Sequence, residues 1–561
     1  LVDAAPGGCA IVHSDSDQGI QRLNQEAAKA VAAAARGGLS VPPERAIRWV
    51  TSNAAGALGI ADVTGSLESG KNADVVLWNG NPFSVYALAD EVWIDGALVW
   101  DRDDPARQPE MDFSLGMLPD EPFSPGAAPP ADGSRRPATG STVARPPAPR
   151  PVLHSETVAI TGATVHTLGA DGTLEDATVV IADGRIVAVG RDVAVPSGAR
   201  VIDGRGKGVT PGFFDSLSRL GLVEVGAVAG SRDTATEDER ISAAFRVADA
   251  FNPESTLLPV TRVEGLTRAL VAPSPGGSLI AGQAAVVHLG GGSDPIVVTP
   301  AALLVTLGER GARFAGGSRA AALLALREAL EDARDYAQHR DAWAQGRRRD
   351  YALSRLDLEA LVPVVEGRLP LLVMVDRASD IRSVLALAAE QGLRLVVAGG
   401  AEAWRVADEL AAAGVPVLVD PLDNLPSSFE TLGATLDNAA RLHAAGVTVA
   451  LMSEDAHNAR NLRQAAGNAV AHGLPPQAAL AAMTSVPAAI WGLGDSYGSL
   501  VPGREADVVV WDGDPLELTS YPEAVFIRGR QVPRDNRQIR LRDRYRDLPV
   551  AGDLPLAYPR P

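Results

Sequence analysis

The sequence predicts an α/β protein: a (β/α)8 TIM barrel with a composite β-sandwich domain, preceded by the C-terminal part of a second such unit. Three observations predict this fold class. Apolar runs of strand length alternate with helical stretches across residues 209–503. Short β-branched segments with glycine turns lie on both sides of that region. A stretch of 49 residues also occurs twice, far apart in the chain.

The composition limits the classes of protein and of partner that fit this chain. The chain has 561 residues and a formal net charge of −18, so nucleic acid is not expected as a partner. No apolar run approaches the roughly 20 residues of a membrane span. The single cysteine, Cys9, excludes an intrachain disulfide but leaves the cellular compartment open. The opening residues resemble the middle of a domain, so any targeting segment is expected upstream.

The repeat is the strongest feature. Thr51–Val99 aligns with Thr484–Val532 without a gap, and 20 of 49 positions are identical. After a six-residue shift, Leu23–Val31 aligns with Leu462–Val470. A repeat at this distance indicates a duplicated large domain. The chain is therefore expected to hold the end of one copy and all of the next, as a fragment of a longer tandem protein.

The repeat and the composition define the expected domains. The stretch before residue 156 is dense in Pro, Gly and Ala, which predicts a semi-rigid linker. The predicted domains are the end of a first unit at 1–103, the linker at 104–155, a β-sandwich at 156–208 and 504–535, a TIM barrel at 209–503, and a tail at 536–561.

The individual elements follow from local pattern. Sandwich strands are expected within 157–168, 176–190 and 199–206, where glycines and Asp-Gly pairs mark hairpin turns. Long helices are expected at 318–339 and 402–414. The glycine-rich stretch 272–287 lacks the Gly-Lys-Ser/Thr ending of a phosphate loop and is interpreted as a βα loop. Buried barrel strands are expected at 266–273, 369–376, 393–400, 415–421 and 447–455.

Three motifs carry a family resemblance. "GATVHTLGADGTLEDATVVIADGRIVAVG", "VIDGRGKGVTPGFFD" and a twice-occurring "GSL-x-x-G-x-x-ADVV" resemble the amidohydrolase superfamily, in its imidazolonepropionase-like branch. The resemblance implies a TIM barrel flanked by a sandwich made from both chain ends. It also implies hydrolysis of C–N bonds in small amides or cyclic amides with one or two divalent metals, zinc or similar. Such a metal lowers the pKa of bound water and polarises the carbonyl.

The metal ligands that the resemblance implies are missing from the second unit. Ser216 and Ser218 stand where the family has His-x-His, and Met374 and Gly399 stand where single histidines are expected. Glu454 stands at the place of the family's aspartate. We therefore expect no metal in the second unit, whose ligand positions are vacated.

A polar cluster follows the expected last barrel strand, where TIM barrels place functional groups. Two interpretations remain open for it: a solvated loop that caps a helix, or a residual pocket that binds a ligand without metal. The cluster consists of Glu454, Asp455, His457, Asn458 and Arg460.

In the first unit, Asp15 falls on the family's carboxylate position. The resemblance implies that Asp15 binds metal and accepts a proton from the nucleophilic water. The alternative is a helix N-cap, because several Ser and Asp residues precede a helical stretch, and Asp17 is a weaker candidate for the role. The histidines that Asp15 would need are expected upstream.

These observations predict a metal-dependent hydrolase of C–N bonds at the level of the whole protein, with the second unit packed against the first. One alternative is a catalytically silent barrel with a structural or ligand-binding role. Another is metal-free acid–base chemistry through Glu454, Asp455 and His457. The 561 residues alone are expected to be inactive, and substrate and oligomeric state stay open.

Overall fold

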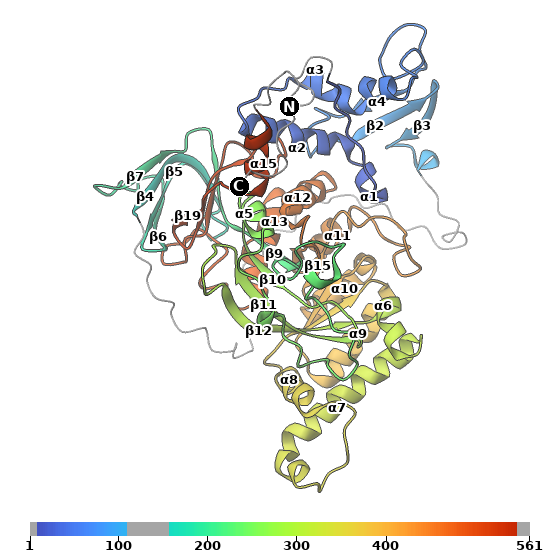
Figure 1. Ribbon diagram of the computed structural model, residues 1–561. Coiled ribbons are helices and arrows are strands. Elements are labelled where there is room, and N and C mark those ends of the chain that lie inside the picture. The colour runs from blue at the N-terminus through green and yellow to red at the C-terminus, as the bar shows by residue number, and fades with distance from the viewer. Residues whose placement is uncertain (1–7, 109–155, 547–561) are drawn as a thin grey trace, which may run out of the picture.

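The computed structural model describes residues 8–108 and 156–546. Most of the predicted linker and the end of the predicted tail lie outside these described residues. Figure 1 shows an N-terminal part stacked on a central barrel, with a β-sandwich at one side of the barrel. The predicted fold class, a barrel with a sandwich domain, is confirmed.

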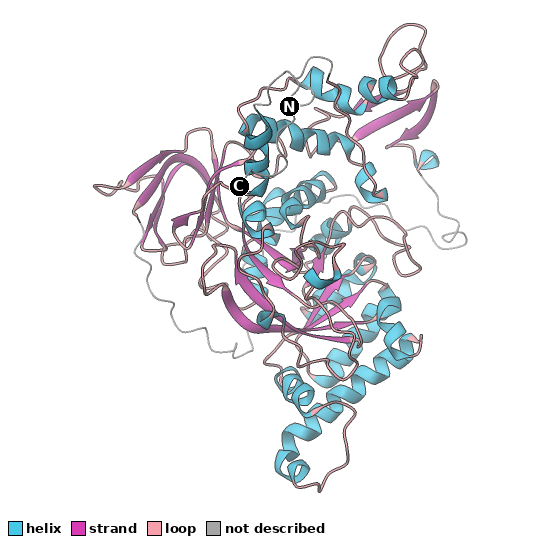
Figure 2. Ribbon diagram, viewed as in Figure 1, coloured by secondary structure: helices cyan, strands magenta, loops and turns pink. Residues whose placement is uncertain are grey.

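Eight strands form the barrel sheet, and the pairing runs without interruption from the last strand to the first. Figure 2 shows the strands in the centre of the molecule with helices around them. The strands are β9 (Phe213–Ser218), β10 (Leu266–Val271), β11 (Ile280–His288), β12 (Ile296–Thr306), β13 (Leu371–Val375), β14 (Leu395–Gly399), β15 (Val417–Val419) and β16 (Val449–Leu451).

One barrel strand departs from the expected alternation. β11 pairs antiparallel with both β10 and β12, whereas the neighbouring strand pairs on either side are parallel. Within the glycine-rich stretch, residues 272–279 join β10 to the antiparallel β11, and residues 280–287 belong to β11 itself. The interpretation of this stretch as a βα loop is therefore wrong. Periodicity alone could not show this, because a buried antiparallel strand and a buried parallel strand are equally apolar.

The helices of the second unit surround the barrel or extend from it. Figure 1 shows α7 reaching furthest from the barrel, with α8 beside it. No helix among the described residues is long and apolar enough to cross a membrane. These helices are α5 (Leu257–Arg262), α6 (Gly308–Ala312), α7 (Arg319–Ala344), α8 (Arg355–Val365), α9 (Ala378–Gln391), α10 (Ala407–Ala413), α11 (Asn438–Ala444), α12 (Leu462–Ala471), α13 (Pro476–Ala482), α14 (Ser485–Ile490) and α15 (Arg537–Arg546).

The sandwich sheet is built from both ends of the second unit. β17 pairs antiparallel with β8, which joins the strands after the barrel to the strands before it. A separate apolar core that includes Ile160 and Phe526 lies inside this domain. Its strands are β4 (Val158–His166), β5 (Thr173–Ala182), β6 (Arg185–Gly190), β7 (Arg200–Asp203), β8 (Gly208–Pro211), β17 (Val508–Trp511), β18 (Pro522–Ile527) and β19 (Arg530–Gln531).

The N-terminal part contains helices and a small sheet. Residues of α2 and the segment around Val85 form an apolar cluster with Leu518 of the second unit. Burial of these side chains joins the two parts of the chain. The elements are α1 (Asp17–Ile20), α2 (Leu23–Arg36), α3 (Pro43–Ala46), α4 (Ser52–Ala57), and the antiparallel strands β1 (Val75–Trp78), β2 (Ala89–Ile94) and β3 (Ala97–Asp101).

Candidate active site at the barrel rim

Hydrogen bonds that Asp215 accepts link the first barrel strand to the loop after the last one. The Asp215 carboxylate lies in β9 and is fully buried. Its Oδ1 accepts from the backbone N–H of Ser453 at 3.0 Å, and its Oδ2 accepts from the Ser453 hydroxyl. Burial raises the pKa of Asp215 to about 7, although these hydrogen bonds favour its charged form. Asp215 therefore holds the loop after β16 against β9.

Ser216 and Ser218, which the resemblance places at the His-x-His positions, both lie in β9. The Ser218 hydroxyl donates to the carbonyl oxygen of Asp455 at 2.9 Å and so adds a second link to the loop after β16. Ser216 is fully buried, and its hydroxyl has no hydrogen-bond partner within residues 8–108 and 156–546. Neutral hydroxyls lack the imidazole nitrogen that zinc prefers.

Met374 and Gly399 lie at the ends of neighbouring strands. Met374 belongs to the apolar cluster that fills the barrel interior, together with Leu217 and Met452. Gly399 has φ +87°, and a Cβ added there would lie 2.5 Å from Oδ1 of Asp376. Apolar side chains thus fill part of the interior beneath the rim, and Asp376 occupies the space that a side chain at position 399 would need.

Two half-buried carboxylates at the rim were missed by the sequence reasoning. Asp376 directly follows β13, and Asp420 directly follows β15. Burial raises the pKa of Asp376 to about 7 and that of Asp420 to about 6. The signal was present, because each aspartate ends an apolar strand run. With Asp215, they give the rim three carboxyl groups that can hold or release protons near neutral pH.

Glu454 is the carboxylate that the sequence placed at the family's aspartate position. It has a positive φ of 50° and pairs with Arg219 and Arg310, each at 3.4 Å. Arg219 is buried, and its guanidinium also donates to the carbonyl oxygen of Ala272 at 2.9 Å. Two cations therefore face Glu454.

The rest of the predicted polar cluster is spread along a turn. The Asp455 carboxylate accepts from the backbone N–H of His457 at 2.8 Å and from the Asn458 amide at 3.0 Å. His457 and Asn458 are exposed, and Arg460 is half-buried. The geometry groups Glu454 with Arg219 and Arg310, and it places His457 on the surface. Asp455 serves the local turn.

Asp15 lies ahead of α1 in the N-terminal part. Its carboxylate is exposed and lies 3.6 Å from Nδ1 of His13. The N-cap of α1 is Ser16, whose hydroxyl accepts from the backbone N–H of Gly19 at 3.1 Å. Asp17 is the first residue of α1. The capping role offered as the alternative for Asp15 is thus filled by Ser16.

The donor set at the second rim does not fit the family's metal. Among the described residues, no three His, Cys, Asp or Glu side chains are grouped so that they could hold a metal ion. The rim presents hydroxyls, a thioether and separate carboxylates, whereas catalytic zinc takes three closely placed nitrogen, sulfur or carboxylate ligands.

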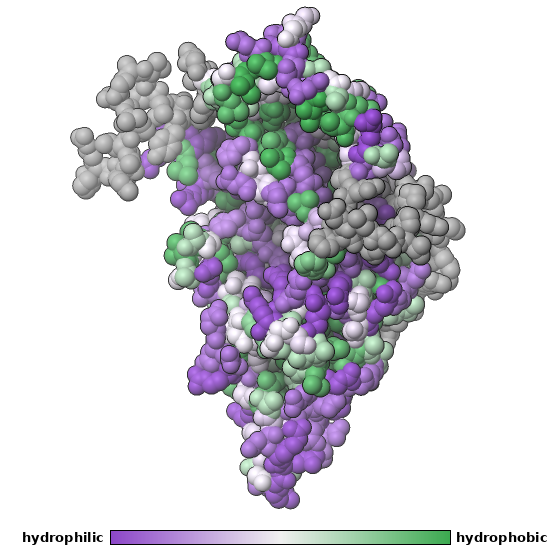
Figure 3. Space-filling model, turned by 90° about the vertical axis from the view of Figure 1, so that its right-hand side faces the viewer, coloured by the Kyte–Doolittle hydropathy of each residue, from purple (hydrophilic) through white to green (hydrophobic). Residues whose placement is uncertain are grey.

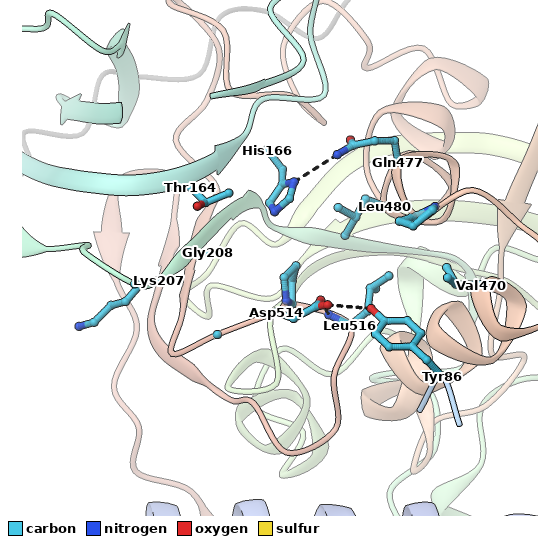
Figure 4. Close-up of a pocket in the computed structure, with 14 residues that line it drawn as sticks. Tyr86, Thr164, His166, Lys207, Gly208, Val470, Gln477, Leu480, Asp514 and Leu516 are labelled. Atoms are coloured by element: carbon cyan, nitrogen blue, oxygen red, sulfur yellow. Dashed lines mark hydrogen bonds between the residues drawn. The ribbon is translucent and has the colours of Figure 1, made fainter. Parts of the chain in front are cut away.

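A pocket of about 660 Å³ lies away from this rim, between the sandwich, α13 and Tyr86 of the N-terminal part. Figure 4 shows His166 and Asp514 on facing walls of this pocket. The amide nitrogen of Gln477 donates to Nδ1 of His166 at 3.3 Å, and the Tyr86 hydroxyl donates to Asp514 at 2.9 Å. Burial lowers the pKa of His166. The volume suits a small molecule.

Comparison with known proteins agrees with the barrel and the sandwich. Two models described as amidohydrolase family match the chain, one over residues 356–533 and one over residues 19–100. The crystal structure of an amidohydrolase from Thermotoga maritima MSB8 is 28% identical with a TM-score of 0.61, and the match covers 67% of this chain and 100% of that chain. Parts of the chain thus match amidohydrolase family models, and the chain is similar to amidohydrolases in sequence and in fold.

A curated relative, amidohydrolase tasK of Hapsidospora irregularis, is 25% identical over 366 residues. The match covers 60% of this chain but only 37% of the length of that relative.

Proposed function

We propose that the whole protein is a metal-dependent hydrolase of C–N bonds in non-peptide amides or cyclic amides, in the imidazolonepropionase-like branch of the superfamily. In this proposal a first unit, of which residues 1–103 are the end, carries out the reaction, and the second unit supports it. The observation that supports this proposal most directly is the set of side chains at the rim of the second unit's barrel. The resemblance places Ser216, Ser218, Met374 and Gly399 at the ligand positions of that barrel. Among the described residues, no three His, Cys, Asp or Glu side chains are grouped to hold a metal, which supports the proposal.

The exposed apolar surface of the N-terminal part supports a duplicated unit. Leu67 is 81% exposed, whereas Leu500, its aligned partner in the second unit, is 2% exposed. Leu58 is 75% exposed, and its aligned partner Trp491 is 5% exposed. Figure 3 shows apolar surface gathered at the end of the molecule that the N-terminal part forms. These positions match residues that a barrel and a sandwich cover in the second unit.

Asp15 is the residue of the first unit to which we assign chemistry. It aligns with Glu454 at the end of the last barrel strand. A metal bound there would supply an activated water. Asp15 would bind that metal and accept the proton of the water.

The loop after β15 supports a role for the second unit at the first unit's site. The amide nitrogen of Gln18 in α1 donates to the Asp423 carboxylate at 2.8 Å. Gln21 and Asn424 also share a hydrogen bond, at 3.0 Å. This loop of the second unit thus touches the helix that starts two residues after Asp15.

A second candidate function is a metal-free role of the second barrel, either ligand binding or acid–base chemistry. The observation that favours it is the arrangement of Glu454 between Arg219 and Arg310, close to carboxyl groups with raised pKa. In this candidate Glu454 moves the proton, since Asp455 is engaged by the turn and His457 is exposed.

The test uses the protein with a complete first unit and a panel of amides and cyclic amides. We expect turnover that a chelator abolishes and zinc restores, loss of turnover in Asp15→Asn, and normal turnover in Glu454→Gln. Turnover that survives the chelator and falls in Glu454→Gln would replace the first candidate by the second. The 561 residues alone should bind no stoichiometric metal and hydrolyse none of the panel.

A further inference from the structure

The contacts between α2 and α12 follow the internal repeat. In the alignment, Gln25 corresponds to Gln464 and Lys29 corresponds to Asn468. Gln25 exchanges hydrogen bonds with Asn468 at 2.9 Å in both directions. Lys29 donates to Gln464 at 3.0 Å. If each residue is replaced by its counterpart in the other copy, the contact of Gln25 with Asn468 becomes the contact of Gln464 with Lys29. An interface with a twofold axis has this property.

Two residues also contact their own counterparts. The Gln464 amide donates to the Gln25 side-chain oxygen at 3.0 Å. Ser84 aligns with Glu517, and the Ser84 hydroxyl donates to Oε1 of Glu517. A residue can meet its own equivalent only on the symmetry axis. These two pairs therefore mark where a local twofold axis passes between the copies.

The apolar contacts show the same symmetry between the two copies. Val85 packs against Gly467, where an added Cβ would lie 2.6 Å from the valine methyl carbons. The counterparts of these two residues are Leu518 and Ala28, and both lie in the same buried cluster as Val85. Hydrogen bonds and apolar packing thus share one pseudo-twofold arrangement.

We propose that the two units pair as an internal dimer about this axis, and that Glu517 makes the pairing specific for the first unit. The inference rests on the proposed duplication, but it concerns assembly and not hydrolysis. Glu517 accepts from the Ser84 hydroxyl, and its Oε2 accepts from the backbone N–H of Val85 at 3.2 Å.

The same geometry disfavours the wrong pairings. Two second units on this axis would bring Glu517 against Glu517, and the two negative charges would repel. Two first units would bring Ser84 against Ser84 and lose the charge-assisted hydrogen bond. The difference between Ser84 and Glu517 at this equivalent position therefore favours the pairing of a first unit with a second unit.

The test is an exchange of the two axis residues in the 561-residue chain. The readout is the rate of tryptic cleavage at Lys29 and Arg36, which follows the opening of α2 from the second unit. We expect Ser84→Glu to speed cleavage about tenfold, the scale of a lost charge-assisted hydrogen bond with added repulsion. The exchange variant Ser84→Glu/Glu517→Ser should return to within about threefold of wild type.

Ser197→Glu adds the same charge at an exposed loop and should leave the cleavage rate unchanged. If Ser84→Glu does not stay folded, the comparison is made from Glu517→Ser, where adding Ser84→Glu must slow cleavage. An exchange variant that is cleaved as fast as the worse single variant would overturn the pseudo-twofold pairing. This outcome would leave the hydrolase proposal intact, because no turnover is measured.

Discussion

Asp215 should make the stability of this protein fall as the pH rises from about 4 to about 7. The folded pKa of about 7 lies above the ordinary value of 3.8 for an aspartate. A raised carboxyl pKa means that the protonated form is favoured in the folded state. The resulting stabilisation is fully present below pH 3.8 and is lost as the pH rises through about 7. The difference of about three pKa units corresponds to about 4 kcal/mol.

Asp215→Asn isolates this contribution. The amide resembles the protonated carboxyl, since its oxygen can still accept from the Ser453 N–H and its nitrogen can donate to the Ser453 hydroxyl. The variant cannot titrate at this position. Between pH 4.5 and 7.5, its free energy of unfolding should gain about 3 kcal/mol relative to wild type.

The assay is urea unfolding of both proteins at the two pH values, followed by tryptophan fluorescence. Asp376 and Asp420 titrate in both proteins, so their contributions cancel in the difference. Parallel pH dependences for the two proteins would show that Asp215 stays charged at neutral pH, and would refute the argument from burial.

Two further predictions concern stability. Arg268→Met should destabilise the chain by about 3–5 kcal/mol, because it leaves Asp507 buried without its charge partner. The control Arg205→Met removes an exposed ion pair and should change the free energy of unfolding little. Equal losses of stability in the two variants, measured by denaturant unfolding, would contradict this prediction. Gly399→Ala should cost about 1–3 kcal/mol more than Gly414→Ala. Both glycines have positive φ, but only position 399 has a carboxylate 2.5 Å from the added carbon. If thermal melts show the same loss of stability for both alanine variants, the proposed steric conflict with Asp376 is wrong.

The pattern of apolar residues was sufficient to predict most of the barrel. Runs such as 369–376 and 393–400 became β13 and β14, because a strand buried on both faces needs apolar side chains at every position. The direction of β11 was not predictable in this way, since its residues are equally apolar in either direction. Its orientation was set by pairing with β10 and β12.

At the barrel rim, too, some features were predictable from the sequence and others were decided only by the tertiary structure. The prediction that Ser216 and Met374 stand at vacated ligand positions depends only on sequence motifs. That His457 is exposed, and that Glu454 faces Arg219, depends on the path of one turn after β16. Local sequence sets which residues follow a strand, whereas neighbouring strands decide which of them meet.

By itself, the sequence determined the alternation of strands and helices and the internal repeat. These properties depend on residue type and spacing along the chain. Only the tertiary structure decided the buried ion pair of Arg268 with Asp507, the raised pKa of Asp215, and the contact of Ser84 with Glu517. Each of these joins or encloses groups hundreds of residues apart, and burial and charge act through distance in space.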